Sequence, residues 1–278
     1  MISKFSFKYA DRKIQLKNFS AVKEDGKITG TIGYSLPDSR LDYQLSLRQL
    51  GSSELALYKR LPFALDFKAV GEFQGSQSPG RWRHRGFLGL SQSRVHDKVV
   101  PDSTFEWDVR NDSVSIDAKV AKDWIVLSTT SLNDRGSTKI TSDLAVDIPD
   151  LPLFLRGVLG ENPQLVNATG DLSLVSKFSL TDWQWNRVEA ETWLKGIRLV
   201  TNEIGLQQRF PAPQVRIRDG KIEQWNIKLD APDLKITSKA TGDLRNNLIV
   251  QNNIDLDAKY FELLSKHVQR AEVRASAE

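Results

Sequence analysis

Residues that commonly do chemistry are scarce in this chain and are not grouped. The histidines are His84, His96 and His267, and only His96 has a carboxylate, Asp97, beside it. Cysteine is absent, which excludes disulfides, thiolate metal sites and a thiol nucleophile. No G-x-S-x-G, P-loop or G-x-G-x-x-G motif occurs, so nothing indicates an activated serine or a nucleotide cradle. The sequence therefore predicts a protein that is not an enzyme and that uses no metal or cofactor.

The sharpest cluster of charge is the run Arg-Trp-Arg-His-Arg at 81–85. On a strand, Arg81, Arg83 and Arg85 fall on one face, and Trp82 and His84 fall on the other. One interpretation is a clamp for phosphate, which would make the three arginines candidates for contact with lipid headgroups. The other is a solvated strand face with Trp82 in the core. The whole chain has 39 basic and 35 acidic residues, a mixed surface that does not predict nucleic-acid binding.

The elements that must position these residues are mostly strands. From Leu234 to Leu244, alternate residues are apolar or small while those between them are polar, which gives one dry face and one wet face. About a dozen stretches repeat this pattern, including a long one from Val166 to Leu180 and another from Val188 to Leu199 with a change of phase near Trp193. Only 40% of the residues are hydrophobic, which suits sheets with one solvated face.

Helix signals are few. The segment 150–159 predicts a short amphipathic helix with Asp150 as N-cap and Gly160 just past its end. Weaker signals occur at 53–60 and 261–274. Two or three short helices cannot cover a dozen half-apolar strands, so the sheet must fold on itself or hold something else. The expected organisation is one elongated β region over 1–278, with imperfect repeats that allow a division into 1–149 and 150–278.

Several segments share a style of strand, turn and strand. They are VRIRDGKI at 215–222, WNIKLDAP at 225–232 and LKITSKATGDL at 234–244, with DGKITG at 25–30 and the break DIPDL at 147–151. In these segments the chain resembles the TamB family, within the AsmA-like group of bacterial envelope proteins. The chain lacks the membrane anchor of that family and is shorter than its members, which indicates a fragment of a longer protein.

The resemblance implies a fold, a place and a role. The expected fold is mainly β: a long antiparallel or mixed sheet curled lengthwise into an open trough, with a few short helices. The expected location is the periplasm, with the parent protein anchored in the inner membrane and reaching the outer membrane. The implied ligand is phospholipid, and the implied further role is in outer-membrane protein assembly, with a barrel-assembly protein as partner.

Physical chemistry gives the same expectation an independent reason. A dry face must be covered, since its burial is worth roughly 25 cal/mol per Å², and acyl chains can cover it without any hydrogen bonds. The residues expected to line such a groove are Ile28, Ile32, Tyr34, Leu36, Phe63, Leu65, Phe67, Val166, Leu172, Leu174, Phe178, Ile227, Leu229, Leu234, Ile236, Leu244, Val250, Ile254 and Leu256.

Two alternatives remain open from the sequence. In a closed β-sandwich or barrel, two dry faces would cover each other, and the protein would act as a scaffold or a protein-binding module of the envelope. A transmembrane β-barrel would need lipid-facing strands of about 9–11 residues between two aromatic girdles, and the aromatic residues form no such two-belt pattern. The open trough is the leading expectation, the closed sandwich is the alternative that the sequence does not separate from it, and the transmembrane barrel is disfavoured.

Overall fold

The fold is a single long β-meander. The computed structural model describes residues 2–52, 65–95, 98–159, 162–202, 204–232 and 234–256, and these form one sheet of 18 strands. The strands are β1 (Ile2–Ala10), β2 (Lys13–Lys23), β3 (Gly26–Ser35), β4 (Arg40–Gly51), β5 (Leu65–Ser78), β6 (Arg81–Val95), β7 (Lys98–Val99), β8 (Ser103–Arg110), β9 (Ser113–Val120), β10 (Ile125–Asp134), β11 (Ser137–Ile148), β12 (Thr169–Thr181), β13 (Val188–Val200), β14 (Gly205–Arg209), β15 (Val215–Arg218), β16 (Lys221–Ala231), β17 (Leu234–Thr241) and β18 (Ile249–Leu256).

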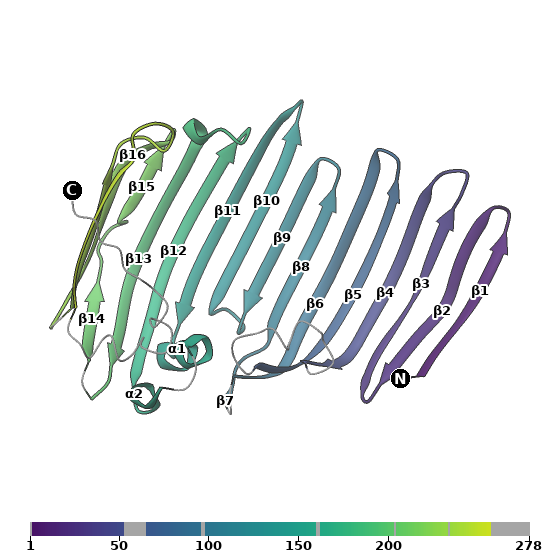
Figure 1. The fold of residues 1–278 in the computed structure, drawn as a ribbon, viewed down its shortest axis with the longest axis horizontal. Helices are drawn as coiled ribbons and strands as arrows, with labels where there is room; N and C mark the ends of the chain where they lie inside the picture. Colours follow the sequence, from purple (N-terminus) through teal and green to yellow (C-terminus); the bar gives the residue numbers. More distant parts are fainter. Residues whose placement is uncertain are drawn as a thin grey trace.

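Every described pairing is antiparallel and joins near neighbours along the chain. The order runs from β1 to β6, passes from β6 to β8 with the short β7 beside it, and continues to β13. β13 then pairs with β14 over one half and with β15 over the other, and β15 leads through β16 and β17 to β18. Within the described residues β1 pairs only with β2, and β18 only with β17, so the sheet stays open. Figure 1 shows this succession of strands along the molecule.

The sheet curls at its C-terminal end. One buried cluster runs over the ends of the strands, from Ile148 of β11 through Leu199 of β13 and Leu206 of β14 to Ala231 of β16 and Leu234 of β17. The last strands overlap behind β14 and β15 in the view of Figure 1. The expected mainly β fold, curled into an open trough, is confirmed, and the closed sandwich is not what forms.

The two α-helices of the described residues are short and lie together at one end of the strands, and a 3-10 turn lies at the other end (Figure 1). α1 (Leu151–Leu159) follows β11, α2 (Pro163–Val166) precedes β12, and the 3-10 turn η3 (Trp185–Arg187) joins β12 to β13. As predicted, α1 begins after Asp150, whose Oδ1 accepts a hydrogen bond from the Leu153 N–H at 3.0 Å. The predicted C′ residue Gly160 and the helix signals at 53–60 and 261–274 lie outside the described residues.

Two strand predictions are wrong at their ends. The strand expected from Val166 begins only at Thr169, because Asn162 caps α2 by accepting a hydrogen bond from Gln164 N and Pro163 occupies the first turn. The strand expected to reach Leu244 ends at Thr241, because Gly242 has a φ of +110° and turns the chain. The phase change expected near Trp193 occurs close by, where a bulge in β13 separates Leu194 from Gly196.

Candidate functional site

Strand register places most of the apolar residues on a single face from β3 to β16, although a few, such as Val70, Phe87 and Trp193, lie on the opposite face. We call the former the apolar face and the latter the polar face. One row of directly paired positions crosses β3, β4, β5, β6, β8, β9, β10, β11, β12, β13, β15 and β16. In that order its residues are Ile28, Leu47, Gly71, Leu88, Phe105, Ala118, Leu127, Leu144, Ser176, Thr192, Val215 and Trp225.

The few polar groups of this row satisfy each other. Ser176 and Thr192 are directly paired, and their hydroxyl oxygens are 2.8 Å apart. At the next apolar-face position of β10 and β11, Thr129 and Ser142 form a similar pair, with their hydroxyl oxygens 3.0 Å apart. At the described paired positions of β3–β6 and β8–β13, the apolar face carries no Asp, Glu, Lys or Arg. The face is therefore continuous in chemistry as well as in backbone.

Glycines on the apolar face are covered by neighbouring aromatic rings. A side chain at Gly86 would overlap the ring of Trp107, which is paired opposite it. Trp107 in turn packs against Phe73, with ring centroids 5.6 Å apart. Gly75 lies in the same way beneath Tyr43 and His84. These glycines let the rings lie flat on the sheet and keep the face smooth.

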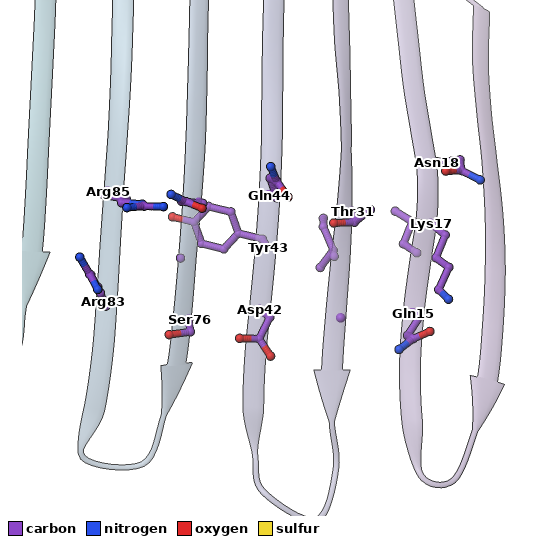
Figure 2. A pocket seen from close by; sticks show the side chains of 15 residues that line it. Gln15, Lys17, Asn18, Thr31, Asp42, Tyr43, Gln44, Ser76, Arg83 and Arg85 are labelled. Atoms are coloured by element: carbon purple, nitrogen blue, oxygen red, sulfur yellow. The ribbon is translucent and has the colours of Figure 1, made fainter.

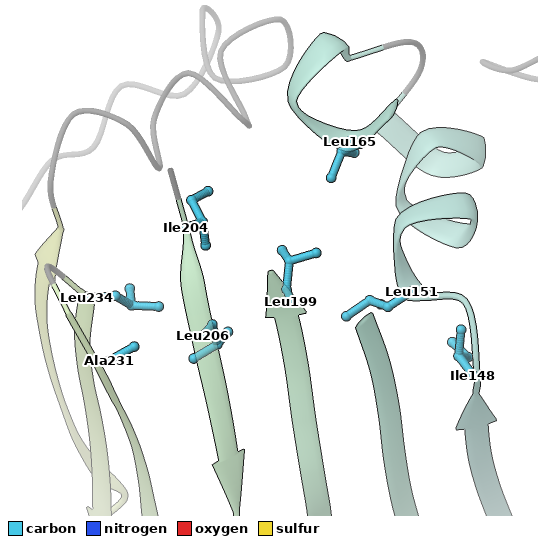
Figure 3. Close-up of a cluster of buried hydrophobic side chains, with 8 residues drawn as sticks. All are labelled: Ile148, Leu151, Leu165, Leu199, Ile204, Leu206, Ala231 and Leu234. Carbon is cyan, nitrogen blue, oxygen red and sulfur yellow. The ribbon is translucent and has the colours of Figure 1, made fainter. Parts of the chain in front are cut away.

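The two halves of the apolar face differ in what covers them. In the C-terminal half, α1, α2 and the curled strands bury the cluster shown in Figure 3, which comprises Ile148, Leu151, Leu165, Leu199, Ile204, Leu206, Ala231 and Leu234. A second cluster buries Leu180, Val188, Val215 and Ile217. In the N-terminal half, apolar-face residues such as Ile14, Ile32 and Tyr34 are more than a third exposed. The apolar face is thus packed around these two clusters and lies open over β2 and β3, and again at β18, where Val250 and Ile254 are 44% and 66% exposed.

Most of the residues expected to line a groove do share the apolar face. By strand register this holds for Ile28, Ile32, Tyr34, Leu172, Leu174, Phe178, Ile227, Leu229, Leu234, Ile236, Val250 and Ile254. Phe67 is half-buried in β5, Leu36 is exposed just beyond β3, Val166 is exposed in α2, and Leu244 packs against the second cluster. Leu65 and Leu256 lie on strands, but their side chains are outside the description, as is the whole of Phe63.

The three arginines lie on the other side of the sheet. Arg83 and Arg85 pair with Ser76 and Gln74 on the polar face, and Arg81 pairs with Ser78 near the turn. Arg83 and Arg85 line a polar-face hollow of about 660 Å³ together with Gln44 (Figure 2). Because the sheet separates them from the apolar residues, these arginines are not part of the apolar face.

The polar face is held by cross-strand ion pairs. Arg83 Nη2 and Arg110 Nη2 both donate to Asp108 Oδ2, at 3.0 and 2.9 Å. Hydrogen bonds from these two guanidinium groups, Arg110 foremost, hold the pKa of Asp108 well below its usual range. Further pairs join Arg216 to Glu191 and Arg198 to Asp171. This face therefore has the charge pattern of a solvated surface.

Sequence reasoning missed one polar feature of the apolar face. Tyr43 Oη and His84 Nδ1 lie 2.9 Å apart above Gly75, and the two rings are stacked with centroids 5.7 Å apart. Trp82 tilts against His84 from the same strand, at 5.8 Å. The alternation of 41–47 and of 82–90 did place Tyr43 and His84 on the dry face, but only the register brings them together.

The described residues contain no group of three or more His, Asp or Glu arranged to hold a metal ion. No described helix has the length and apolar character needed to cross a membrane. No family model, curated protein or solved structure matches this chain. The two faces of the sheet are therefore the features of this chain that bear on its function.

Proposed function

We propose that this chain is a non-enzymatic segment of a lipid conduit whose apolar face carries the acyl chains of phospholipids. The observation that carries the proposal is the row from β3 to β16, which is apolar except for the mutually bonded Ser176 and Thr192 and lies in the open in the N-terminal half. A soluble domain normally covers such a face with a second layer. Here the described part of the chain supplies that layer only near the curled end.

Acyl chains suit this face for physical reasons. The strand ladders satisfy the backbone, so the ligand need supply no hydrogen bonds. Each methylene that leaves water contributes about 0.8 kcal/mol, and a face without charged groups lets a chain move along it without meeting a site that holds it. Continuity of the lining, and not any single residue, is what such a conduit requires.

The place of the conduit follows as part of the same proposal. A segment that moves phospholipid acyl chains through water belongs between two membranes, and the TamB-like style of its strands points to the periplasm, between inner and outer membranes. In that setting the chain works within a longer parent protein anchored in the inner membrane, and an assembly protein of outer-membrane barrels is a further partner. The proposal includes no nucleic acid and no cofactor.

The test is transfer of phospholipid by the purified chain. Donor vesicles of phosphatidylcholine with a fluorescent analogue are mixed with acceptor vesicles, and the chain is expected to accelerate transfer. Ile32→Asp places a charge on the exposed part of the apolar face and should abolish the acceleration. Thr31→Asp, one residue away on the polar face, is the matched control and should not. Equal effects of both variants with intact circular dichroism, or no transfer by the unaltered chain, would refute the proposal.

A further inference from the structure

The two long edges of the sheet are built differently. We call the upper edge the one that carries the turns β1–β2, β3–β4, β5–β6, β8–β9 and β10–β11, and the lower edge the one beside α1 and α2 (Figure 1). A lipid lying parallel to the strands must direct its headgroup to one edge and its acyl ends to the other. The difference between the edges therefore bears on how a lipid lies in the trough.

The lower edge is closed. At β11 to β14, α1 and α2 pack over the strand ends, and Leu165 of α2 is 1% exposed. At β4 to β8, apolar residues close to this edge are also buried: Leu50, one residue before the end of β4, is 8% exposed, Ala69 of β5 is 2% exposed, and Val100, which follows β7, is 9% exposed. Buried apolar walls of this kind exclude a charged headgroup, because removing a charge from water costs several kcal/mol.

From β1 to β6 the upper edge is open and carries rings with polar tips, whereas from β12 to β16 the second cluster buries Leu180, Val188 and Ile217 beside it. On the apolar face, the residues nearest this edge include Tyr9, Tyr34 and Trp82, which are 59%, 36% and 40% exposed. Farther along the same edge, Trp183 and Trp185 are exposed where β12 turns into β13. Every exposed tyrosine or tryptophan in the described part of the chain lies at this edge. Tyr and Trp have this amphipathic character where an apolar region meets a wet one.

Polarity also falls in steps from the upper to the lower edge. Along β5 the apolar face presents Gln77, Gly75, Phe73, Gly71 and Ala69, and exposure falls in that direction. Along β6 it presents Trp82, His84, Gly86, Leu88 and Leu90. The Tyr43–His84 pair is thus one step inside the rim, where it sets a hydroxyl and an imidazole beside an otherwise apolar surface.

The length of the strands suits a phospholipid lying parallel to them. From His84 to Leu90 the strand advances six residues, roughly 20 Å at about 3.3 Å per residue. One leaflet of a bilayer has a hydrocarbon layer of about 15 Å, half of the full core. We propose that phospholipids lie parallel to the strands over β2–β6, with their acyl ends toward the level of Leu90 and Ala69, their glycerol esters at the level of Tyr43 and His84, and their phosphates outside Trp82. This orientation rests on the proposed function.

Site-specific fluorescence quenching can test the orientation, because the chain has no cysteine of its own. Ile14→Cys and Ala21→Cys place a label on the apolar face of the same strand, β2, near the upper and lower edges respectively. Thr31→Cys places the same label on the polar face. Each labelled chain is loaded with phosphatidylcholine that carries a nitroxide either on the headgroup or at the end of an acyl chain, and is then separated from vesicles by gel filtration.

The headgroup nitroxide should quench the label at position 14 at least threefold more than the label at position 21, and the acyl-end nitroxide should show the reverse order. Neither should quench the label at position 31. The orientation would be wrong if the acyl-end nitroxide quenches a label on the apolar face but the headgroup nitroxide quenches positions 14 and 21 equally, or position 21 more strongly. The proposed conduit would still hold in that case. Absence of quenching by both lipids at both apolar-face positions would overturn the conduit itself.

A second measurement tests the Tyr43–His84 pair as the ester contact. Tyr43→Phe keeps the ring above Gly75 and removes only the hydroxyl. Affinity for phosphatidylcholine should fall about threefold to tenfold, in line with the loss of one hydrogen bond, while affinity for a long-chain alkane should stay unchanged. An equal fall for both ligands would mean that Tyr43 acts only by packing, and an unchanged affinity for the phospholipid would remove the contact from the inference.

Discussion

Ile148 ends β11 and Leu234 begins β17, yet both are buried in one cluster. Leu199 of β13, Leu206 of β14 and Ala231 of β16 link them through the strands between. This cluster, with α1 and α2 packed over the same strand ends, is the closure of the C-terminal half of the trough. The C-terminal half of the trough owes its shape to this contact, whereas the N-terminal half has hydrogen-bonded strands but no comparable second layer within the described residues.

The stability of this closure should depend strongly on the Leu165 side chain. Leu165→Ala removes a side chain that is 1% exposed in the cluster, so the free energy of unfolding should fall by about 2–4 kcal/mol. Val166→Ala, the next residue of α2 and 53% exposed, is the matched control and should change it by less than about 0.5 kcal/mol. Urea denaturation followed by tryptophan fluorescence measures both. A similar small effect of both variants would contradict the assignment of the closure.

Gly86 should be intolerant of a side chain. Gly86→Val would drive a Cβ into the ring of Trp107, and the free energy of unfolding should fall by about 1–3 kcal/mol because the ring must move. The control is Gly33→Val in β3, where a Cβ would meet nothing within 4 Å. The control should be neutral or slightly stabilising, because valine favours strands. Near-ultraviolet circular dichroism should report the displaced tryptophan in the first variant only.

Asp108 should make stability depend on pH in acid. Arg110 and Arg83 hold its folded pKa below the usual carboxyl range, so its stabilising contribution is complete above the unfolded pKa of about 3.9. That contribution is lost as the pH falls from the unfolded pKa through the lower pKa of the folded state. At pH 7, Asp108→Asn should reduce the free energy of unfolding by at most about 1 kcal/mol, because the ion pairs are open to solvent.

The pH series gives the decisive comparison for Asp108. The difference in free energy of unfolding between the unaltered chain and Asp108→Asn, measured by urea denaturation, should narrow steadily as the pH falls from 5 to 2. Asp171→Asn is a useful control, since its partner Arg198 also lies on the polar face but Asp171 has that single ion pair. A difference in free energy of unfolding that stays constant down to pH 2 would contradict the lowered pKa of Asp108.

The start of α1 should depend on the cap at Asp150. Asp150→Ala removes the acceptor for the Leu153 N–H and should cost about 1 kcal/mol of the free energy of unfolding. Asp150→Ser retains a side-chain oxygen at the cap and should recover most of the loss. Thermal melts of the three proteins make the comparison, and a serine variant as unstable as the alanine variant would show that the cap is not what matters.

Period-two alternation was enough to predict most of the strands and the face that each residue occupies, as with Ile28, Ile32 and Leu174. It failed at Val166 and Leu244, where a local turn overrides the pattern. The α2 cap at Asn162 and the positive φ of Gly242 act within a few residues, and both are compatible with the alternating sequence around them.

Other features could not be predicted because they arise between distant segments. Bulges place Asn18, Gln49 and Gln92 at positive φ; asparagine favours that conformation, but the two glutamines carry no such signal. The curl at Ile148 and Leu234 sums the twist of many strands. The pairing of Tyr43 with His84 needs the register of β4, β5 and β6 together, and no single stretch of sequence contains it.

The strictly sequential pairing of the strands has a consequence for how such a protein changes length. Each hairpin contacts mainly the hairpins before and after it, so the fold behaves as a nearly one-dimensional array. One hairpin with the same alternation can be inserted or removed without rearranging the remainder, since no distant crossover must be preserved. Folding can likewise start at any hairpin and spread to its neighbours through contacts that are close in sequence. Evolution can therefore adjust the reach of this sheet in increments of two strands.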